Sequence, residues 1–408
     1  MKPLRERAKM EYLECLFCQK KFPLNIFNPF CPDCGAPLLY FYPPQNKELY
    51  LDKENPLERA LDFLPLNKVN LNLTLGEGNT PLIKLSGIMN QFNFPSLYAK
   101  NETTNPTYSF KDRGTAVALQ KAVSLGIKNI GTVSTGNMAA STSAFGAKAG
   151  LKTMILLKED TSREKLLSSA IHSPTLIKVK GDYGKLFYKS FSVGKSHRIY
   201  FMNSVDPFRI EGYKITGFEI FLHFNQKAPD YIVVPVSSGG HLIGLMRAFL
   251  DLKKQGLIQK TPTFVGVQAK GCSPIAQAFS SGYSRVKRIQ KGRTIAHGIS
   301  NPDPPGGNIV LQMIKENNGF IIDSTDKQIS SAQKSLAQKE GIFCQASSAA
   351  ALAGLYKLSS KTQFKPEDRI VLILTGSGLK AMEELSSMTF PLHKTSLPQL
   401  ESLLNHHF

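Results

Sequence analysis

The 408-residue sequence lacks any long apolar run. It contains no stretch of about 18 apolar residues, so we expect no transmembrane helix. The N-terminus is basic, but no apolar segment of a secretory signal follows it. Internal repeats and low-complexity tracts are also absent. The content of 42% hydrophobic and 20% charged residues is typical of a globular protein, and we expect a soluble, cytoplasmic one.

Acidic residues are scarce relative to basic ones. The chain has 50 Lys and Arg against 31 Asp and Glu, a formal net charge of +19. Such an excess can mark a surface for nucleic acids or acidic membranes. However, the basic residues are scattered, with only short clusters such as residues 284–293. A positive field also attracts anionic substrates, so the excess of basic residues does not require a nucleic acid, and we expect neither a membrane nor a nucleic acid as partner.

Cysteines are few, and four of the six are organised. Cys272 and Cys344 stand alone in apolar surroundings, as buried small residues do. The other four form two C-x2-C pairs separated by twelve residues, a pattern that suits a tetrahedral structural Zn²⁺. Two disulfides are the alternative, which a chain without a secretory signal disfavours. The predicted zinc ligands are Cys15, Cys18, Cys31 and Cys34.

The length of the chain suits two or three domains. From about residue 75, short β-branched runs alternate with helical stretches. Strands between helices indicate parallel βαβ units, and therefore an α/β fold with open sheets. The predicted strands are residues 131–135, 152–157, 231–236, 263–268 and 369–375, and the predicted helices are 138–149, 242–254, one that begins with a capping box at 325–328, and a short one at 397–408.

Four loops that follow strands have unusual compositions, and α/β sheets bind ligands at such positions. One loop places Lys111 between Phe110 and a helix start, where shielding favours a neutral, nucleophilic amine. A solvated surface lysine is the ordinary alternative. A second loop places Asn137 at a helix start, where it can bind an anion or a ring oxygen. A plain N-cap is the alternative there.

The other two loops are rich in glycine. Between Ser238 and His241, the adjacent Gly239 and Gly240 let the backbone aim N–H groups at a phosphate, although such a turn alone is a weak signal. Residues 375–380 (TGSGLK) expose two hydroxyl groups on a glycine turn. Together the four loops offer an amine, an amide, a phosphate-binding turn and a pair of hydroxyls. A phosphorylated aromatic aldehyde needs that set.

The sequence resembles the threonine synthase family and the wider fold-type II group of enzymes that use pyridoxal phosphate (PLP). The similar segments follow the family's order and spacing, from about Leu75 to Lys380. They are residues 76–82 (GEGNTPL), 109–114 (SFKDRG), 134–137 (STGN), 203–212 (NSVDPFRIEG), 239–240 (GG), 268–275 (QAKGCSPI), 346–350 (ASSAA) and 375–380 (TGSGLK). Some members also carry a ribbon with cysteine pairs in front, as here.

The resemblance implies two open α/β domains with parallel sheets flanked by helices, preceded by a small N-terminal zinc ribbon. The large, PLP-binding domain would comprise residues 46–125 and 213–395, and the small α/β domain residues 126–212. Residues 1–45 would form the zinc-ribbon-like segment, joined by a proline-containing linker at 42–46, and residues 396–408 a C-terminal tail. Dimers are usual in this group, so we expect a homodimer.

The resemblance also implies roles for individual residues. Lys111 would be the Schiff-base lysine and proton shuttle, and Asn137 would bind the 3′-oxygen of PLP. The turn 238–241 would hold the PLP phosphate through backbone amides. Thr375 would face the pyridine nitrogen, where a neutral hydroxyl suits elimination and replacement. The residues near the substrate would be Ser134, Thr135, Met138, Asn203, Arg163 and Lys165, of which the last two would help to hold an anionic leaving group.

The sequence departs from the family at three places. Tyr108 stands where the family usually has glycine, and Met138 where it usually has a threonine that contacts the substrate phosphate. The phosphate turn, residues 237–241, reads SSGGH instead of GNAGN, which is closer to dehydratase-like relatives. Loss of one hydroxyl from an anion site costs about 1–3 kcal/mol, enough to shift a substrate preference.

We therefore expect a PLP-dependent lyase of the threonine synthase type, which converts O-phospho-L-homoserine and water into L-threonine and phosphate. The departures keep a second hypothesis open. It is a cysteate synthase, or another β-replacement enzyme or dehydratase, acting on O-phosphoserine or a related amino acid. A catalytically silent ribbon protein that binds nucleic acid is a third hypothesis, which the intact Lys111 opposes.

Overall fold

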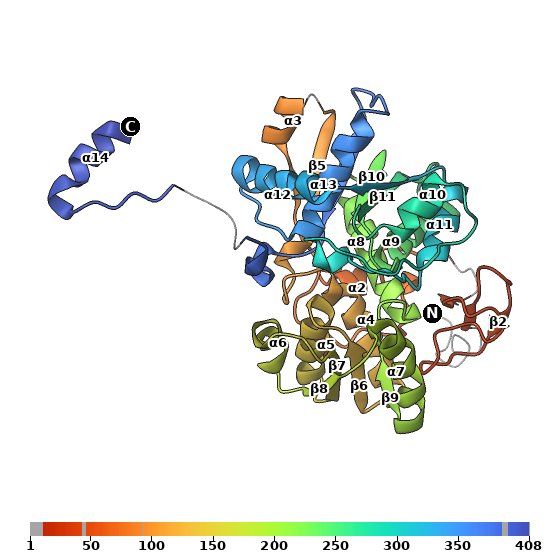
Figure 1. Cartoon of the computed structure of the whole chain (residues 1–408). Coiled ribbons are helices and arrows are strands. Elements are labelled where there is room, and N and C mark those ends of the chain that lie inside the picture. The colour runs from red at the N-terminus through yellow and green to blue at the C-terminus, as the bar shows by residue number, and fades with distance from the viewer. Residues whose placement is uncertain (1–10, 43–45, 93, 386–390, 408) are drawn as a thin grey trace.

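The structure is a computed structural model that describes residues 11–42, 46–92, 94–385 and 391–407. The basic start of the chain and residues 43–45 of the predicted linker lie outside the described residues. The described chain forms a three-stranded, a six-stranded and a four-stranded sheet. Figure 1 shows the strands and helices of the six-stranded sheet above those of the four-stranded sheet, with the N-terminal strands at one side. Among these residues, no helix has both the length and the apolar character needed to cross a bilayer.

The N-terminal sheet is a small antiparallel ribbon with the strand order β2-β1-β3. Its strands are β1 (Tyr12–Glu14), β2 (Lys21–Phe22) and β3 (Leu39–Phe41). The ribbon packs on two long helices, α8 (Pro207–His223) and α9 (Gly240–Lys254). The ring of Tyr40 lies 5.7 Å from that of Phe208, and Arg247 donates a hydrogen bond to the carbonyl of Tyr40 at 2.7 Å. The ribbon therefore shares its core with the rest of the chain.

The six-stranded sheet has the order β12-β11-β10-β13-β5-β4. Its strands are β4 (Leu82–Lys84), β5 (Ser96–Asn101), β10 (Tyr231–Pro235), β11 (Thr263–Ala269), β12 (Phe320–Ser324) and β13 (Arg369–Leu374). All neighbours are parallel except β4 and β5, which are antiparallel. The sheet is therefore parallel as predicted except at this edge, where β4 is antiparallel. The connection from β4 to β5, residues 85–95, is shorter than the dozen or more residues that a parallel crossover needs.

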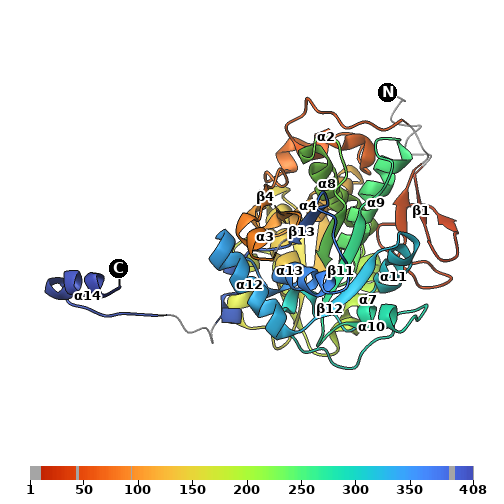
Figure 2. The same cartoon turned by 90° about the horizontal axis from the view of Figure 1, so that it is seen from above.

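Helices cover both faces of this sheet, so its central strands are mostly apolar. Alternate residues of β10 divide between two cores, because successive side chains of a strand point to opposite faces. Ile232 and Val234 join the core of α8 and α9, whereas Val233 joins that of α12 (Asp326–Glu340) and α13 (Ala346–Ser359). Figure 2 shows α12 on one side of the strands and α8 and α9 on the other.

The four-stranded sheet is parallel throughout, with the order β8-β7-β6-β9. Its elements are β6 (Asn129–Val133), α5 (Asn137–Lys148), β7 (Lys152–Lys158), α6 (Arg163–Ala170), β8 (Thr175–Val179), α7 (Tyr183–His197) and β9 (Ile199–Phe201). The predicted strand at 131–135 exists but ends at Val133, so Ser134 and Thr135 lie in the following loop. All four strands fall within the predicted small domain, 126–212, whose boundaries remain a prediction.

The remaining helices complete the layers. They are α2 (Pro56–Arg59), α3 (Ser86–Phe92), α4 (Lys111–Ser124), α10 (Pro274–Ser280), α11 (Gly307–Glu316) and α14 (Leu400–His407), with 3₁₀ turns at Leu61–Phe63, Leu71–Leu73, Glu102–Thr104, His297–Ile299, Gly378–Lys380, Met382–Leu385 and Leu397–Gln399. The capping box between Thr325 and Gln328 is confirmed. Helix α14, in the predicted tail, lies apart from the other elements in both views (Figures 1 and 2).

Candidate active site

A cleft of about 2050 Å³ is lined by the loops that follow parallel strands of both large sheets. Its walls include the residues directly after β6, β7, β10 and β13, together with the start of α4. Ligands of α/β proteins bind at such strand ends. The structure brings most of the predicted site residues together here. Those that line the cleft are Lys111, Ser134, Thr135, Asn137, Met138, Lys165, Ser238, Gly239, Gly240, His241 and Thr375.

Lys111 is the first residue of α4, and its amine is shielded. Its Nζ lies 4.2 Å from the centre of the Phe110 ring. Among the described residues, Nζ has no hydrogen-bond or ion-pair partner. Burial and the positive charge of Arg209 lower the pKa of Lys111 to about 7. A large fraction of the amine is therefore neutral, and nucleophilic, at neutral pH.

An aromatic stack lies beside Lys111. The imidazole of His241 stacks on Phe110 at 3.9 Å between ring centres, and the edge of Tyr213 meets it at 5.3 Å. Burial and the nearby Lys111 hold the pKa of His241 well below its usual value, so the ring is neutral. Neither ring nitrogen has a partner among the described residues. The sequence indicated only a backbone role for His241, because a stack of rings leaves no local signature.

The phosphate-binding turn predicted after β10 is built on two crowded glycines. Gly239 has a φ of 100°, the left-handed region, and it precedes the first turn of α9. A Cβ on Gly240 would lie 2.4 Å from the carbonyl oxygen of Ser204, and one on Gly239 would lie 2.9 Å from Val310. Larger residues would push this backbone away from its neighbours. The turn therefore leaves the unpaired first-turn amides of α9 at the cleft wall, where an anion can bind.

Asn137 and Thr375 also line the cleft. Asn137 is the first residue of α5, and Thr375 directly follows β13. The Nδ2 of Asn137 donates a hydrogen bond to Oε1 of Gln345 at 2.9 Å. The hydroxyl of Thr375 lies 2.9 Å from that of Ser348, which also accepts a bond from the amide of Gly376. Sequence reasoning missed both Gln345 and Ser348. Their only signal was their place at the family-like ASSAA segment, residues 346–350.

Two of the predicted substrate residues do not line the cleft. The amide of Asn203 is occupied internally, since Oδ1 accepts bonds from Thr132 and from the backbone of Val133, and Nδ2 donates to Ser190. It ties β6 to the segment after β9. Arg163 begins α6 outside the lining, whereas Lys165 lies in the wall and forms an ion pair of 3.5 Å with Glu383.

Tyr108 lies at the cleft wall in a conformation that favours glycine. Its φ is 61°, its side chain is 54% exposed, and its carbonyl accepts a hydrogen bond from the amide of Ser377 at 3.0 Å. A side chain in this left-handed region costs about 1–2 kcal/mol. The backbone thus gives a physical reason why a glycine would be usual here.

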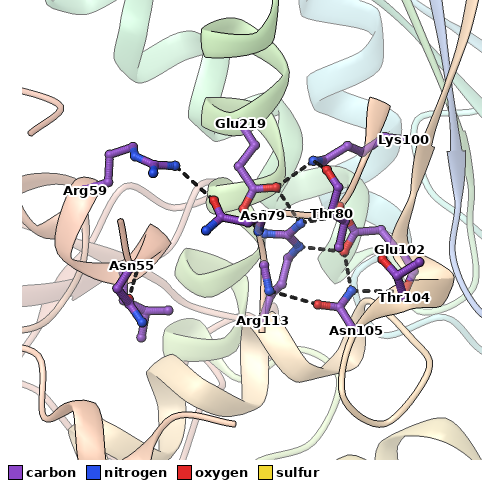
Figure 3. A network of polar contacts seen from close by, with 12 residues as sticks. Asn55, Arg59, Asn79, Thr80, Lys100, Glu102, Thr104, Asn105, Arg113 and Glu219 are labelled. Carbon is purple, nitrogen blue, oxygen red and sulfur yellow. Dashed lines mark hydrogen bonds and ion pairs between the residues drawn. The ribbon is translucent and has the colours of Figure 1, made fainter. Parts of the chain in front are cut away.

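A buried cluster of charges surrounds Arg113 (Figure 3), which follows Lys111 by two positions on α4. Arg113 is fully buried and binds Glu102 through Nε at 2.5 Å and Glu219 through Nη1 at 2.7 Å. Lys100 adds a second positive charge, 2.6 Å from Glu219. Burial alone would raise the pKa of Glu219, but Arg113 and Lys100 together hold it well below its usual value.

The GEGNTPL segment, residues 76–82, closes this cluster. The hydroxyl of Thr80 donates to Glu102 at 2.8 Å, and the backbone amide of Asn79 donates to Glu219 at 2.8 Å. The amide of Gly78 donates to the side chain of Asn105 at 3.1 Å. The family-like segment therefore supports the helix that carries Lys111 through the bonds of Gly78, Asn79 and Thr80.

The four cysteines of the ribbon come together as predicted. Their sulfur atoms all lie within 4.8 Å of one another. Cys15 and Cys34 lie 3.3 Å apart, and Cys18 and Cys31 lie 3.6 Å apart, as free thiols. A Zn²⁺ with bonds of about 2.3 Å in a tetrahedron needs sulfurs roughly 3.8 Å apart. The cluster is compatible with a metal of this size.

Comparison with known proteins agrees with this geometry. A family model described as pyridoxal-phosphate dependent enzyme matches residues 73–376. Threonine synthases from Methanocaldococcus jannaschii and Halalkalibacterium halodurans are each 34% identical to this chain, over 373 and 353 residues. The alignments cover 90% and 86% of this chain, and 92% and 96% of the relatives.

Solved structures share the fold at lower identity. Maize serine racemase superposes with a TM-score of 0.64 at 19% identity, covering 81% of this chain and 94% of that one. Cysteine synthase from Entamoeba histolytica also gives 0.64, at 22% identity, covering 84% of this chain and 98% of that one. These similarities support the α/β architecture alone.

Proposed function

Because the chain belongs to the pyridoxal-phosphate-dependent enzyme family, we propose that it is a threonine synthase, which converts O-phospho-L-homoserine and water into L-threonine and phosphate. Relatives that carry this name match most of the chain. The structural observation that carries the proposal is Lys111. It is a shielded amine of lowered pKa in a cleft whose other loops match the remaining parts of PLP.

The residues around the cleft fit this cofactor. The glycine turn at 239–240 packs too closely on Ser204 and Val310 to carry a Cβ, and the first-turn amides of α9 that follow it suit a phosphate. The amide of Asn137 suits the phenol oxygen, and the hydroxyl of Thr375 suits the ring nitrogen. Lys111 would hold the aldehyde covalently. When bound, PLP supplies an electron sink for negative charge at a substrate carbon.

The residues of this chain then have separate tasks. With a pKa of about 7, Lys111 Nζ can accept and return protons at neutral pH, which is the role we assign to it. The loop at Ser134 and Thr135 would orient the amino-acid substrate, because its groups lie in the wall beside Asn137. Lys165, in the same wall, would attract the anionic leaving group.

A second function stays in view because of two residues in the wall. Tyr108 narrows the cleft where the family usually has glycine, and the buried Met138 brings a thioether where it usually has a hydroxyl. Both changes favour a different anionic amino acid. Cysteate synthase, or another β-replacement enzyme or dehydratase that acts on O-phosphoserine, is therefore the alternative.

Phosphate release separates the two functions. We expect the purified protein, loaded with PLP, to release phosphate from O-phospho-L-homoserine and to form L-threonine. Lys111→Ala should bind PLP weakly through the phosphate turn, without the visible absorption band of lysine-bound PLP, and should release no phosphate. Phosphate release from O-phospho-L-serine alone would contradict the threonine synthase assignment and support the alternative.

For the ribbon, we propose a structural Zn²⁺ held by the four cysteines. All four positions of a tetrahedral site would then be filled, leaving none for catalysis. Elemental analysis should find one zinc per chain, and replacement of Cys18 and Cys34 by alanine should abolish it. The double variant should keep the absorption of bound PLP. Zinc content unchanged in the double variant would refute the site.

The homodimer and the division into two domains are part of the same proposal and rest on the family resemblance, whereas the cytoplasmic location rests on the composition of the sequence. Light scattering of the purified chain tests the first. A mass of one chain of 45.0 kDa, instead of two, would exclude the dimer.

A further inference from the structure

One hydrogen bond of the cleft joins the two large sheets. Asn137 begins α5, after the short loop that follows β6 of the four-stranded sheet, whereas Gln345 precedes α13, which packs on the six-stranded sheet. Their side chains meet at 2.9 Å, although 208 positions separate them in the chain. Both residues line the cleft. The contact therefore belongs to the site and depends on how its two walls face each other.

The backbone of Gln345 is anchored, and the residue is buried. Its backbone amide donates to the carbonyl of Gly376 at 3.0 Å, and the residue is only 8% exposed. A Cβ on Gly376 would lie 2.9 Å from Oε1 of Gln345 and 3.2 Å from Nδ2 of Asn137. Glycine at this position thus leaves just enough room for the two amides to meet.

The bond fixes which way the amide of Asn137 faces. An asparagine amide presents a carbonyl oxygen on one side and an NH₂ group on the other. Because Gln345 Oε1 accepts one hydrogen of Nδ2, the NH₂ group must point toward Gln345. Its second hydrogen, and Oδ1, have no partner among the described residues. A rotation of the amide by half a turn would place two oxygens against each other, which is unfavourable.

We propose that Gln345 is a positioning residue that orients the Asn137 amide, so that an N–H, and not a carbonyl oxygen, is offered to the phenol oxygen of PLP. This inference rests on the proposed function, since it requires the cofactor. Gln345 acts through Asn137. Its effect should therefore appear in cofactor binding before any substrate is added.

The test compares two substitutions that differ in one property. Gln345→Met removes the acceptor oxygen at similar size, whereas Gln345→Glu keeps an acceptor there. We expect Gln345→Met to raise the Kd for PLP roughly tenfold and to shift the pH dependence of the bound cofactor's absorption. Gln345→Glu should bind PLP more tightly than Gln345→Met, because it keeps the acceptor for Asn137, although its buried charge should leave it weaker than the parent.

A matched control is Gln120→Met. Gln120 is also buried and accepts one hydrogen bond, from the amide of Asn70 at 2.8 Å, but it does not line the cleft. Its replacement should lower the free energy of unfolding to a similar extent and leave the Kd for PLP unchanged. The control separates a loss of stability from a loss of positioning.

A double-mutant cycle tests whether Gln345 acts through Asn137. We expect Asn137→Ala with Gln345→Met to bind PLP no more than about twofold more weakly than Asn137→Ala alone. Fully additive losses, or a Gln345→Met variant that binds PLP like the parent, would overturn the inference. Because the readout needs no substrate, PLP binding without phosphate release would reject the threonine synthase proposal and still decide the role of Gln345.

Discussion

Two basic residues in the first turn of α4 have opposite surroundings. Arg113 is fully buried and bound to Glu102 and Glu219, and Lys100 balances the second carboxylate. Lys111, two positions earlier, faces the cleft with no such partner among the described residues, and its neighbour Arg209 is of the same charge. The charge of Arg113 is thus paired within the protein, whereas the amine of Lys111 faces the cleft and can react with a ligand.

The difference explains how the chain keeps a neutral amine near so many charges. The cluster around Arg113 contains two cations and two carboxylates, so it balances itself and offers no counter-ion to Lys111. A buried lysine without a counter-ion has a lowered pKa, because burial penalises its charged form. The ion pairs of Arg113 therefore stabilise the start of α4, and Lys111 on the same turn supplies the reactive amine.

The largest expected effect comes from breaking the buried ion pairs of Arg113. Arg113→Met should lower the free energy of unfolding by about 3–5 kcal/mol, because Glu102 would be left buried without its partner. Lys111→Met should change it by no more than about 1 kcal/mol, since no ion pair is lost, but should abolish covalent attachment of PLP. Urea unfolding of both variants measures the difference. Equal destabilisation by the two substitutions would contradict the difference in surroundings described for Arg113 and Lys111.

Crowding at the phosphate turn gives the next effect. Gly240→Ala should cost about 1–3 kcal/mol of stability, because its Cβ would overlap the carbonyl oxygen of Ser204. It should also weaken PLP binding by displacing the first-turn amides. Gly136→Ala, with open space around its Cβ, is the matched substitution at the start of α5 and should leave the stability nearly unchanged. A similar loss in both variants would contradict the crowding argument.

A smaller effect follows from the pKa of Lys111. In the absence of PLP, the rate of reductive methylation at Lys111 should reach half its maximum near pH 7, well below the ordinary lysine value of 10.5. Between these two values the unfolded chain binds more protons than the folded one, so the Lys111 contribution to stability rises with pH. Lys111→Met should remove this rise. A midpoint near 10 would show that the amine is not shielded.

The smallest effect concerns the backbone at Tyr108. Tyr108→Gly relieves a left-handed φ of 61°, a gain of about 1 kcal/mol that the greater freedom of glycine in the unfolded chain largely offsets. We expect a stability change below about 1 kcal/mol and a wider cleft. The ratio of kcat/KM for O-phospho-L-homoserine over O-phospho-L-serine should rise. An unchanged ratio would exclude Tyr108 from substrate selection.

Local sequence patterns predicted well the residues that face the cleft. Lys111 at a helix start and the glycines at 239–240 carry their chemistry in adjacent residues, and the structure places them in one cleft. Strands β6, β7, β10, β11 and β13 were also predicted, because apolar runs between turns identify them, whereas β4, β5, β8, β9 and β12 were not predicted. The antiparallel edge at β4 was missed, since it depends on the length of a connection.

The side-chain pairs that form within the protein could not be predicted, because the two partners of each pair lie far apart in the sequence. Arg113 meets Glu219 from α8, and Asn137 meets Gln345 from the start of α13. Asn203 was assigned to the substrate from its motif, yet its amide pairs with Thr132 and Ser190. A polar residue in a family-like segment does not reveal from its neighbours whether a ligand or the protein satisfies it.

The order of the six-stranded sheet has a consequence for how the chain is made. β13, among the last strands to leave the ribosome, lies between β10 and β5, and it pairs with residues 96–101 from the first quarter of the chain. Until residues 369–374 emerge, both neighbours present unpaired edges that can associate with other chains. Assembly of the cleft must then wait for the end of translation, and a chain released early would expose the sheet at its centre.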